Sequence, residues 1–512
     1  MGSTPCRATR RTVLKSLAAG AAVLAAGPDS AASPPAPLPR ARPEDLGIDP
    51  AGIRAFVEQV NHKVGGLHSF MLLRRGQVAA EAWWAPCTPQ APHMLFSLSK
   101  SFASTAVGLA VAEGRLSLDA TVASFFPDDL PREVSPNLAA MRLRHLLTMA
   151  TGHDKDATGP TVAAPDGNWV RAFLSLPVEH APGSKFVYNS AATYMCSAIV
   201  QKVTGQTLLR WLTPRVFRPL GIQRPAWDSC PRGINVGGWG LSVKTEDIAR
   251  FGQLYLQKGQ WNGRRILPEE WVAQATAKQI SNGDSGSSDW SHGYGYQFWR
   301  CRHGAYRGDG AFGQFCIVMP DRDAVLAITS GVPDMQAVMN AAWECLLPAM
   351  TNQRPASAAD SRALAGLLAS LSVPGPAARP DPPLARRISG REIRFEPNGD
   401  GLESAVLEFQ RGECRAALRD RQCQRILRCR PDSWTPCTLP REERPGLTME
   451  APAAVRAAWT ADNTWTLRIC FPETPFVETD EFRFEDGRVT VARRLNVSFG
   501  SPERAPLRGR LA

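Results

Sequence analysis

A stretch rich in proline, alanine and serine, residues 351–385, divides the chain into two parts with different patterns. Before it, residues 44–350 alternate between segments with helical spacing of apolar residues and segments with strand-like alternation. After it, residues 386–512 consist of short alternating runs, and Asp486-Gly487 between two of them is a strong hairpin signal. The sequence therefore predicts an α+β domain at 44–350, a linker at 351–385 with one short helix near 361–371, and a small all-β domain of unknown role at 386–512.

The order of segments in the first domain indicates an antiparallel sheet. Two strands joined by a basic turn are predicted at 69–82, and a second strand pair is predicted at 315–329 around Pro320-Asp321. Helices are predicted at residues 49–60, 97–113, 143–148, 191–203, 245–258, 268–277 and 337–349. This layout brings the first and last strands of the sheet together, with a large helical insertion between them.

Residues 1–32 have the order of an export signal. The paired Arg10-Arg11 precedes an apolar run and then small residues that end at Ala32, after which a Pro/Ala-rich linker follows at 33–43. This order is typical of a secretory leader, and the paired arginines resemble the twin-arginine signal. A basic, disordered tail is the alternative. We expect cleavage near Ala32 and a bacterial protein that is periplasmic or secreted.

Composition narrows the classes of partner. With 44% apolar and 21% charged residues, the chain is typical of a globular protein. Its net charge of +11 is not gathered into a Lys/Arg block, so no nucleic-acid partner is expected, and no later apolar run is long enough for a membrane span. The 12 cysteines form no C-x-x-C pair, which argues against zinc. Buried free thiols are expected, with a disulfide or two near the C-terminus as the alternative.

Ser97 and Lys100 carry the clearest chemical signal of the first domain. They lie in the segment L-F-S-L-S-K-S-F-A, at the start of the helix predicted over 97–113. Ser-x-x-Lys places both side chains on one helix face, one turn apart. A lysine with a lowered pKa can take the proton of a serine hydroxyl, and a helix start can stabilise the alkoxide. The alternative is a solvated helix start.

Two further segments offer groups that such a nucleophile needs. Tyr188, in F-V-Y-N-S before a predicted helix, is a candidate general base and acid, with a core tyrosine as the alternative. The glycine-rich run 307–314 lets a strand pass close to a substrate. The N–H groups of Ala311 and Ser97 can then form an oxyanion hole. A simple glycine-rich turn is the alternative for this run.

Taken in order, these elements resemble the serine β-lactamase and penicillin-binding-protein superfamily, especially its class C β-lactamase, D-Ala-D-Ala carboxypeptidase and esterase branch. The resemblance covers about residues 44–350 and includes three more motifs, Leu146–Gly152, Gly237–Ser242 and Glu246–Phe251. It implies a β-lactamase/transpeptidase-like fold, an antiparallel sheet with helices on both sides and a helical subdomain. It also implies an acyl-enzyme at Ser97, proton transfer by Lys100 and Tyr188, and no metal or cofactor.

The second motif departs from the family pattern. The family has Tyr-x-Asn, and this chain has Tyr188-Asn189-Ser190. The family's asparagine often contacts the substrate amide. Either Ser190 or a shifted Asn189 must therefore take its place.

The third motif departs as well. The family has Lys- or His-x-Gly, and this chain has Gly308-Asp309-Gly310, followed by Ala311. The cation that grips a substrate carboxylate is missing there. Arg307, one residue earlier, is a candidate to supply it, although strand alternation would point it elsewhere. We therefore expect an exported esterase or amidase with a neutral acyl group, acting on a small molecule or peptide. A β-lactamase or D-Ala-D-Ala carboxypeptidase is the alternative.

Other readings are weaker. The chain has no G-x-S-x-G elbow, which argues against an α/β-hydrolase. A non-catalytic envelope-binding protein on the same fold is a second alternative, although a binder needs neither Ser97 nor Lys100. Further residues could line the cleft or belong to the core, namely His153, Trp290, His292, Tyr294, Tyr296 and Trp299.

Overall fold

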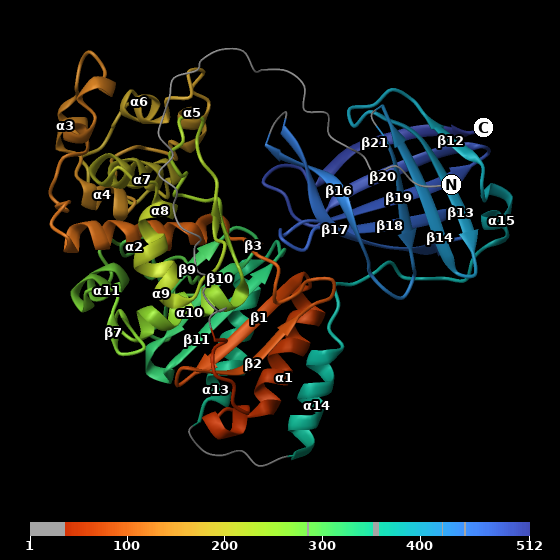
Figure 1. The fold of residues 1–512 in the computed structure, drawn as a ribbon, viewed down its shortest axis with the longest axis horizontal. Coiled ribbons are helices and arrows are strands. Elements are labelled where there is room, and N and C mark those ends of the chain that lie inside the picture. Colours follow the sequence, from red (N-terminus) through yellow and green to blue (C-terminus); the bar gives the residue numbers. More distant parts are fainter. Residues whose placement is uncertain (1–35, 284–285, 352–357, 422, 445–446) are drawn as a thin grey trace, which may run out of the picture.

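The computed structural model describes residues 36–283, 286–351, 358–421, 423–444 and 447–512. The leader expected at 1–32 lies outside the described residues. The chain forms an α+β domain with a helical subdomain, followed by an all-β domain (Figure 1). The fold class predicted from the sequence is thus confirmed.

The sheet of the first domain has six antiparallel strands in the order β2-β1-β11-β10-β9-β8. Its strands are β1 (Leu67–Arg74), β2 (Gln77–Trp83), β8 (Trp299–Arg300), β9 (Tyr306–Gly310), β10 (Gln314–Met319) and β11 (Ala324–Ser330). Strand β1 pairs with β11, with Phe70 opposite Ile328. The first and last strands are therefore neighbours, as their order in the sequence predicts.

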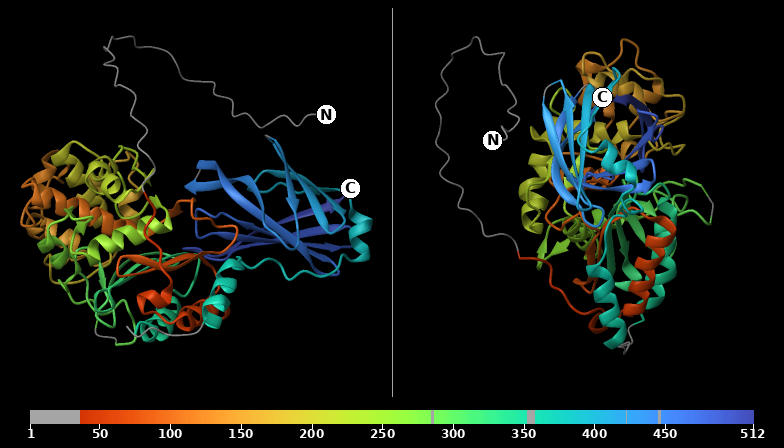
Figure 2. Two further views of the ribbon diagram at one scale, coloured as in Figure 1. Left: turned by 60° about the horizontal axis from the view of Figure 1, so that its bottom comes forward. Right: turned by 90° about the vertical axis from the view of Figure 1, so that its right-hand side faces the viewer.

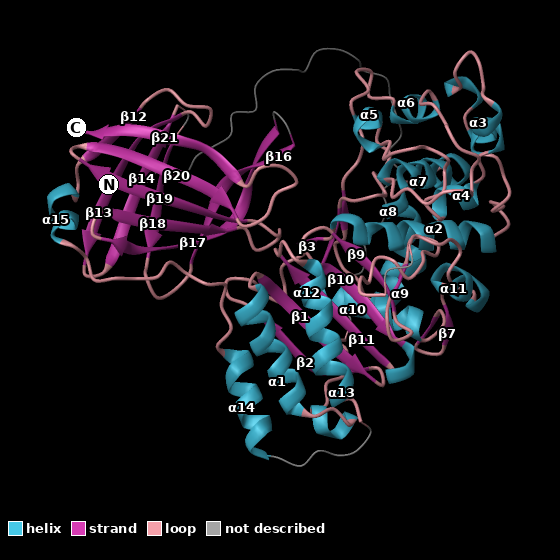
Figure 3. Ribbon diagram, turned by 180° about the vertical axis from the view of Figure 1, so that it is seen from behind, coloured by secondary structure: helices cyan, strands magenta, loops and turns pink. Residues whose placement is uncertain are grey.

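Both faces of this sheet are covered by helices. Phe70 and Leu72 of β1 face α1 (Pro50–Gln59), α12 (Met335–Ala341) and α14 (Ala358–Ala369), which lie over one face in Figure 3. Met71 and Leu73 point the other way, into the core with α2 (Ser99–Ala112) and α10 (Thr245–Leu256). This alternation is the period of two expected for a strand buried on both sides.

The helical subdomain is inserted between β2 and β8. Its helices are α3 (Pro136–Ala140), α4 (Leu143–Leu147), α5 (Thr158–Val162), α6 (Trp169–Leu174), α7 (Ser190–Thr204), α8 (Leu208–Leu212) and α9 (Arg218–Leu220). Next come α10 and α11 (Glu269–Thr276). Helix α7 begins where Asn189 caps it and ends at Gly205, whose φ of 69° is left-handed. Helix α2 is buried along nearly its whole length, which makes it the central helix of the domain.

Short elements complete the first domain. Small strands are β3 (His93–Met94), β4 (Ala226–Trp227), β5 (Leu241–Val243), β6 (Gln260–Trp261) and β7 (Arg264–Arg265), and α13 spans Leu347–Ala349. The 3₁₀ segments are Pro43–Leu46, Phe96–Leu98, Val122–Phe125, Pro127–Asp129 and Pro320–Arg322, and the π segments are Val60–Val64, Thr213–Phe217 and Ala342–Leu346. Helix α14 falls within the stretch predicted as a linker, yet its Leu364 packs into the core beside α1.

The all-β domain, called the β domain below, is a single antiparallel sheet of ten strands, β12–β21. After α15 (Pro383–Ile388) its strands are β12 (Glu392–Phe395), β13 (Leu402–Gln410), β14 (Glu413–Asp420), β15 (Gln424–Cys429), β16 (Thr435–Arg444), β17 (Leu447–Ala461), β18 (Thr464–Cys470), β19 (Val477–Glu485), β20 (Arg488–Leu495) and β21 (Glu503–Leu511). The predicted Asp486-Gly487 turn joins β19 to β20, with φ values of 48° and 75°. The sheet curls around an apolar core that includes Trp459 and Trp465 (Figure 1).

The two domains lie side by side and are held by specific bonds (Figure 2). The Asn496 side chain, beyond β20, donates to the carbonyls of Gly331 (2.8 Å) and Pro475 (2.9 Å). The Met94 N–H donates to the Glu473 carbonyl at 2.9 Å. A Cβ on Gly331 would lie 2.0 Å from the Pro475 oxygen, so only glycine fits at this contact.

Two expectations about the whole chain concern cysteines and membranes. The eleven cysteines that the structure describes are all free thiols, and most are buried. Within the described ranges, no helix combines the length and the apolar character needed to span a bilayer.

Candidate active site

Ser97 lies in the 3₁₀ turn Phe96–Leu98, directly before α2. The helix predicted over 97–113 thus starts with a tighter turn and becomes α-helical at Ser99. Phe96, just before the serine, has a φ of 47°, which is uncommon for a residue other than glycine. Such strain is held by the surrounding fold and is often found at functional sites.

The Lys100 amine is buried and has three close partners. Its Nζ lies 2.9 Å from Ser97 Oγ, 2.9 Å from Ser190 Oγ and 2.7 Å from the Gly238 carbonyl oxygen. A neutral amine has two N–H donors and one lone pair. The Gly238 carbonyl can only accept, and Ser190 can accept, so the lone pair is left for the Ser97 hydroxyl. The arrangement suits transfer of a proton from Ser97 to Lys100.

The electrostatics of Lys100 favour this transfer. Burial lowers the pKa of Lys100 to about 7, while the charges of Asp156 and Asp309 act in the opposite direction. None of the three partners of Nζ is charged, so no carboxylate holds the proton by a direct bond. A substantial fraction of Lys100 is therefore neutral near pH 7.

Tyr188 lies against both members of this pair. Its ring centroid is 4.8 Å from Lys100 Nζ, and its ring stacks on Trp299 at 5.3 Å with an interplanar angle of 20°. Burial raises the pKa of Tyr188, and a side-chain hydrogen bond with Ser97 offsets part of that effect. The phenol is thus protonated at neutral pH, which suits a proton donor better than a phenolate base.

The side chains of Asn189 and Ser190 have different roles. Asn189 Oδ1 accepts from the N–H groups of Ala191 (3.0 Å) and Ala192 (3.4 Å), so this side chain caps α7. Ser190 points to Lys100 instead. Of the two candidates left open by the sequence for the missing asparagine, Ser190 is the one that contacts the lysine.

The glycines of β9 bring that strand directly against the serine turn. A Cβ on Gly308 would lie 2.4 Å from Ser101 Oγ, and one on Gly310 would lie 1.9 Å from the Leu95 carbonyl oxygen. No side chain fits at either position. Ala311, which follows Gly310, is consequently placed beside the Ser97 turn, and Gln314 Nε2 fixes its carbonyl with a hydrogen bond of 3.0 Å.

Arg307 is buried and committed to other partners. Its Nε donates to Asp309 Oδ2 at 2.9 Å, and one terminal nitrogen donates to the Asp289 carbonyl at 2.7 Å. Its guanidinium also lies 4.3 Å from the centre of the Trp290 ring. Arg307 therefore does not replace the substrate-binding cation of the third motif, in line with the strand alternation.

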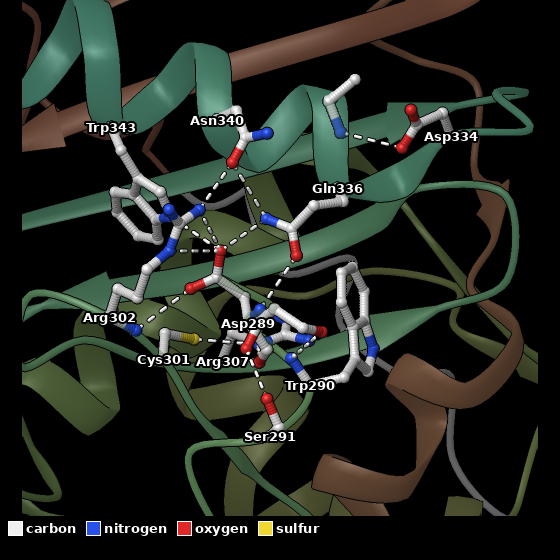
Figure 4. A network of polar contacts seen from close by, with 12 residues as sticks. Asp289, Trp290, Ser291, Cys301, Arg302, Arg307, Asp334, Gln336, Asn340 and Trp343 are labelled. Carbon is white, nitrogen blue, oxygen red and sulfur yellow. Dashed lines mark hydrogen bonds and ion pairs between the residues drawn. The ribbon is translucent and has the colours of Figure 1, made fainter. Parts of the chain in front are cut away.

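A buried network of polar contacts around Asp289 holds Arg307 in place (Figure 4). The Asp289 carboxylate is fully buried and accepts bonds from the Arg302 guanidinium, Gln336 Nε2 (2.7 Å) and Trp343 Nε1 (3.0 Å). Burial alone would raise the pKa of Asp289, but these donors lower it to about 2. The network ties α12 to the segment before β9 and so sets the position of the strand that carries the third motif.

The remaining candidates from the sequence belong to the framework. Tyr294 and Trp299 are buried and form the wall behind Tyr188, and Tyr296 packs on Trp271. His153 is buried with Nδ1 at 2.8 Å from Thr151 Oγ1. His292 is half-buried, three residues after Asp289 in the chain.

Two contributors to the site were missed by the sequence reasoning. The Gly238 carbonyl lies in Gly237–Ser242, a motif identified only by its similarity to the family. Every residue has a backbone oxygen, so the sequence does not indicate which one contacts the lysine. Asp156 acts on Lys100 through its charge, but it lies in a loop without any motif.

Comparison with known proteins identifies the family. The family model described as Beta-lactamase matches residues 53–343, which is more than half of the chain. The chain belongs to the beta-lactamase family. The match runs from within α1 to the π segment Ala342–Leu346 and leaves α13, α14 and the β domain outside. The resemblance inferred from the motifs is therefore confirmed, and with it a hydrolase of the serine type.

Several relatives in this beta-lactamase family are hydrolases by name. The chain is 26% identical over 286 residues to 6-aminohexanoate-dimer hydrolase from Paenarthrobacter ureafaciens, covering 52% of this chain and 73% of that protein. It is 30% identical over 172 residues to esterase EstB from Burkholderia gladioli, covering 30% of this chain and 44% of that protein. Among solved structures, a putative 6-aminohexanoate-dimer hydrolase from Bacillus anthracis aligns with a TM-score of 0.48 at 19% identity, covering 65% of this chain and 86% of that chain.

Proposed function

We propose that this protein is an exported serine hydrolase that forms an acyl-enzyme at Ser97 and cleaves esters or amides with an uncharged acyl group. One observation carries the proposal. Lys100 is a buried amine with a pKa of about 7, and its Nζ lies 2.9 Å from Ser97 Oγ. The names of the relatives support ester and amide chemistry, since they include an esterase and a dimer hydrolase.

The reaction has two halves. As Ser97 Oγ bonds to the substrate carbonyl carbon, neutral Lys100 takes the hydroxyl proton, and the N–H groups of Ser97 and Ala311 stabilise the oxyanion. Tyr188 donates its proton to the leaving oxygen or nitrogen and regains one from Lys100. A water molecule then attacks the ester of Ser97. The proton of this water passes to Lys100, which returns a proton to Ser97 Oγ as the carboxylic acid is released.

The charges around the site support a neutral acyl group. Glycine takes the place of the cation in the third motif, and Arg307 is paired with Asp309. The two ionised groups that act on Lys100 are the carboxylates of Asp156 and Asp309. Because Asp309 balances the charge of Arg307, the third motif offers no unpaired cation to a substrate carboxylate, which β-lactams and D-Ala peptides carry.

Covalent labelling and a substrate panel test the proposal. Wild-type protein should be labelled at Ser97 by a small fluorophosphonate and should hydrolyse p-nitrophenyl butyrate in preference to nitrocefin or a D-Ala-D-Ala peptide. Ser97→Ala should lose both properties while keeping its melting temperature, and the exposed Ser175→Ala should match wild type. Folded wild-type protein without labelling would support the envelope-binding alternative instead.

Export is the second part of the proposal and rests on the sequence of residues 1–32. Expression in a bacterium should yield a shortened protein in the periplasm or medium. Changing Arg10-Arg11 to a pair of lysines should retain the longer form in the cytosol. An unprocessed wild-type chain in the cytosol would contradict this part alone.

A further inference from the structure

Three phenylalanine rings from distant parts of the chain meet beside the nucleophile. The ring centroids of Phe96 and Phe312 are 5.6 Å apart, and Phe499 lies 5.6 Å from Phe96 and 4.8 Å from Phe312. Phe96 and Phe312 belong to the first domain, whereas Phe499 lies between β20 and β21 of the β domain. We call Phe96, Phe312 and Phe499 the aromatic cluster.

The cluster adjoins the groups that the reaction uses. Phe96 is the residue before Ser97, and Phe312 is the residue after Ala311. Both have left-handed backbone conformations, with φ values of 47° and 66°. For bulky residues this conformation is strained, and it persists where the fold imposes it at a functional site. The two strained residues are thus the chain neighbours of Ser97 and Ala311, and their rings meet edge to face.

Phe499 remains open to solvent in spite of these contacts. Phe499 is 77% exposed, the highest value for a large apolar residue among those that the structure describes. A ring that served only to join the domains would be buried between them. Its loop is nevertheless fixed, because Asn496 bonds to Gly331 and also accepts from the Val477 N–H at 2.7 Å. A fixed, exposed aromatic ring beside a reactive serine is typical of a surface that binds an apolar ligand.

We propose that the aromatic cluster binds the acyl group of the substrate, and that the β domain acts through Phe499 as a specificity element. The substrate class is then an ester or amide whose acyl part is apolar and bulky, such as a medium-length alkyl or an aryl group. This inference rests on the proposed function. It adds a role for the β domain, which the family match leaves outside.

A series of acyl lengths on one leaving group tests the proposal. Wild-type protein should prefer p-nitrophenyl octanoate to p-nitrophenyl acetate in kcat/KM. Phe499→Ala should lower kcat/KM for the octanoate by about tenfold and leave the acetate within about twofold, because only the longer chain reaches the ring. Phe499→Leu should restore part of the preference. Ile426→Ala removes another exposed apolar side chain of the β domain and should change neither substrate.

The possible failures are distinguishable. If the small fluorophosphonate labels Ser97 but Phe499→Ala leaves the ratio of octanoate to acetate unchanged, the inference is wrong and the proposed function stands. An equal loss for both substrates would also overturn the inference, since it would indicate a shift of the domains. If wild-type protein is not labelled at all, the proposed function fails first.

Discussion

Lys100 and Arg307 are two fully buried basic side chains in neighbouring segments of one site. They differ in their partners, which are uncharged for Lys100 and include a carboxylate for Arg307. The Lys100 amine contacts two hydroxyls and a carbonyl, and burial lowers its pKa to about 7. The Arg307 guanidinium contacts the Asp309 carboxylate, and a guanidinium does not lose its proton in a protein. The first cation is able to exchange its proton, and the second is a permanent charge that holds a strand in place.

The difference shows how partners decide the role of a buried charge. A carboxylate at hydrogen-bond distance offsets the cost of burial and fixes the ionised form. Uncharged partners satisfy the donors of an amine but leave burial to favour the neutral form. Changing the partners should therefore alter one role without altering the other.

Removal of Lys100 should have the largest effect. Lys100→Ala should lower kcat/KM by about 10²–10⁴-fold, the usual contribution of a general base. The melting temperature should hold or rise, because a desolvated amine is removed. Steady-state kinetics and thermal denaturation measure the two effects, with the exposed Lys202→Ala as control. Activity within tenfold of wild type would contradict the proton-transfer role.

Removal of the charge that anchors Arg302 should act on stability. Asp289→Ala leaves Arg302 without its buried partner and should lower the free energy of unfolding by about 3–5 kcal/mol. Glu269→Ala, which breaks an exposed pair with Lys258, should cost less than about 1 kcal/mol. Urea denaturation compares the two variants, and equal losses would contradict the comparison.

The same residue predicts a pH dependence. The folded-state pKa of Asp289, about 2, lies below the value of about 4 in an unfolded chain. Its contribution to stability is thus present above about pH 4 and is lost as the pH falls toward 2. Urea denaturation between pH 5 and 3 should show a shallower decline for Asp289→Ala than for wild type.

A new carboxylate beside Lys100 should make it resemble Arg307. In wild type, kcat/KM should rise with pH through about 7 as Lys100 loses its proton. Ser190→Asp should raise the pKa of Lys100 by about 1–3 pH units. The rise of kcat/KM should therefore occur at higher pH than in wild type. Ser190→Ala removes the hydroxyl without adding charge and serves as control. If kcat/KM of Ser190→Asp rises at the same pH as in wild type, the titrating group is not Lys100.

The sequence predicts the local elements of this protein well and the contacts between them less well. Strands β1 and β2 and helix α1 follow from periodicity and from the Asp49 cap, because these signals are contained within a few residues. The position of Ser190 rather than Asn189 against Lys100 was left open, since it depends on how α7 is rotated in the packed domain. The Asp289 bonds and the approach of Phe499 join residues far apart in the chain, and no local pattern encodes them.

The tight seam at Gly331 has a consequence for how the enzyme could change. Even one methyl group at this position would collide with the Pro475 oxygen and push on Asn496, the residue that anchors the loop of Phe499. A substitution just after β11 would thereby shift the loop that carries Phe499, which lies far from Gly331 in the sequence. If Phe499 selects the acyl group as proposed, the range of substrates would depend on a glycine at the contact between the domains, which makes no bond to Ser97 or Lys100.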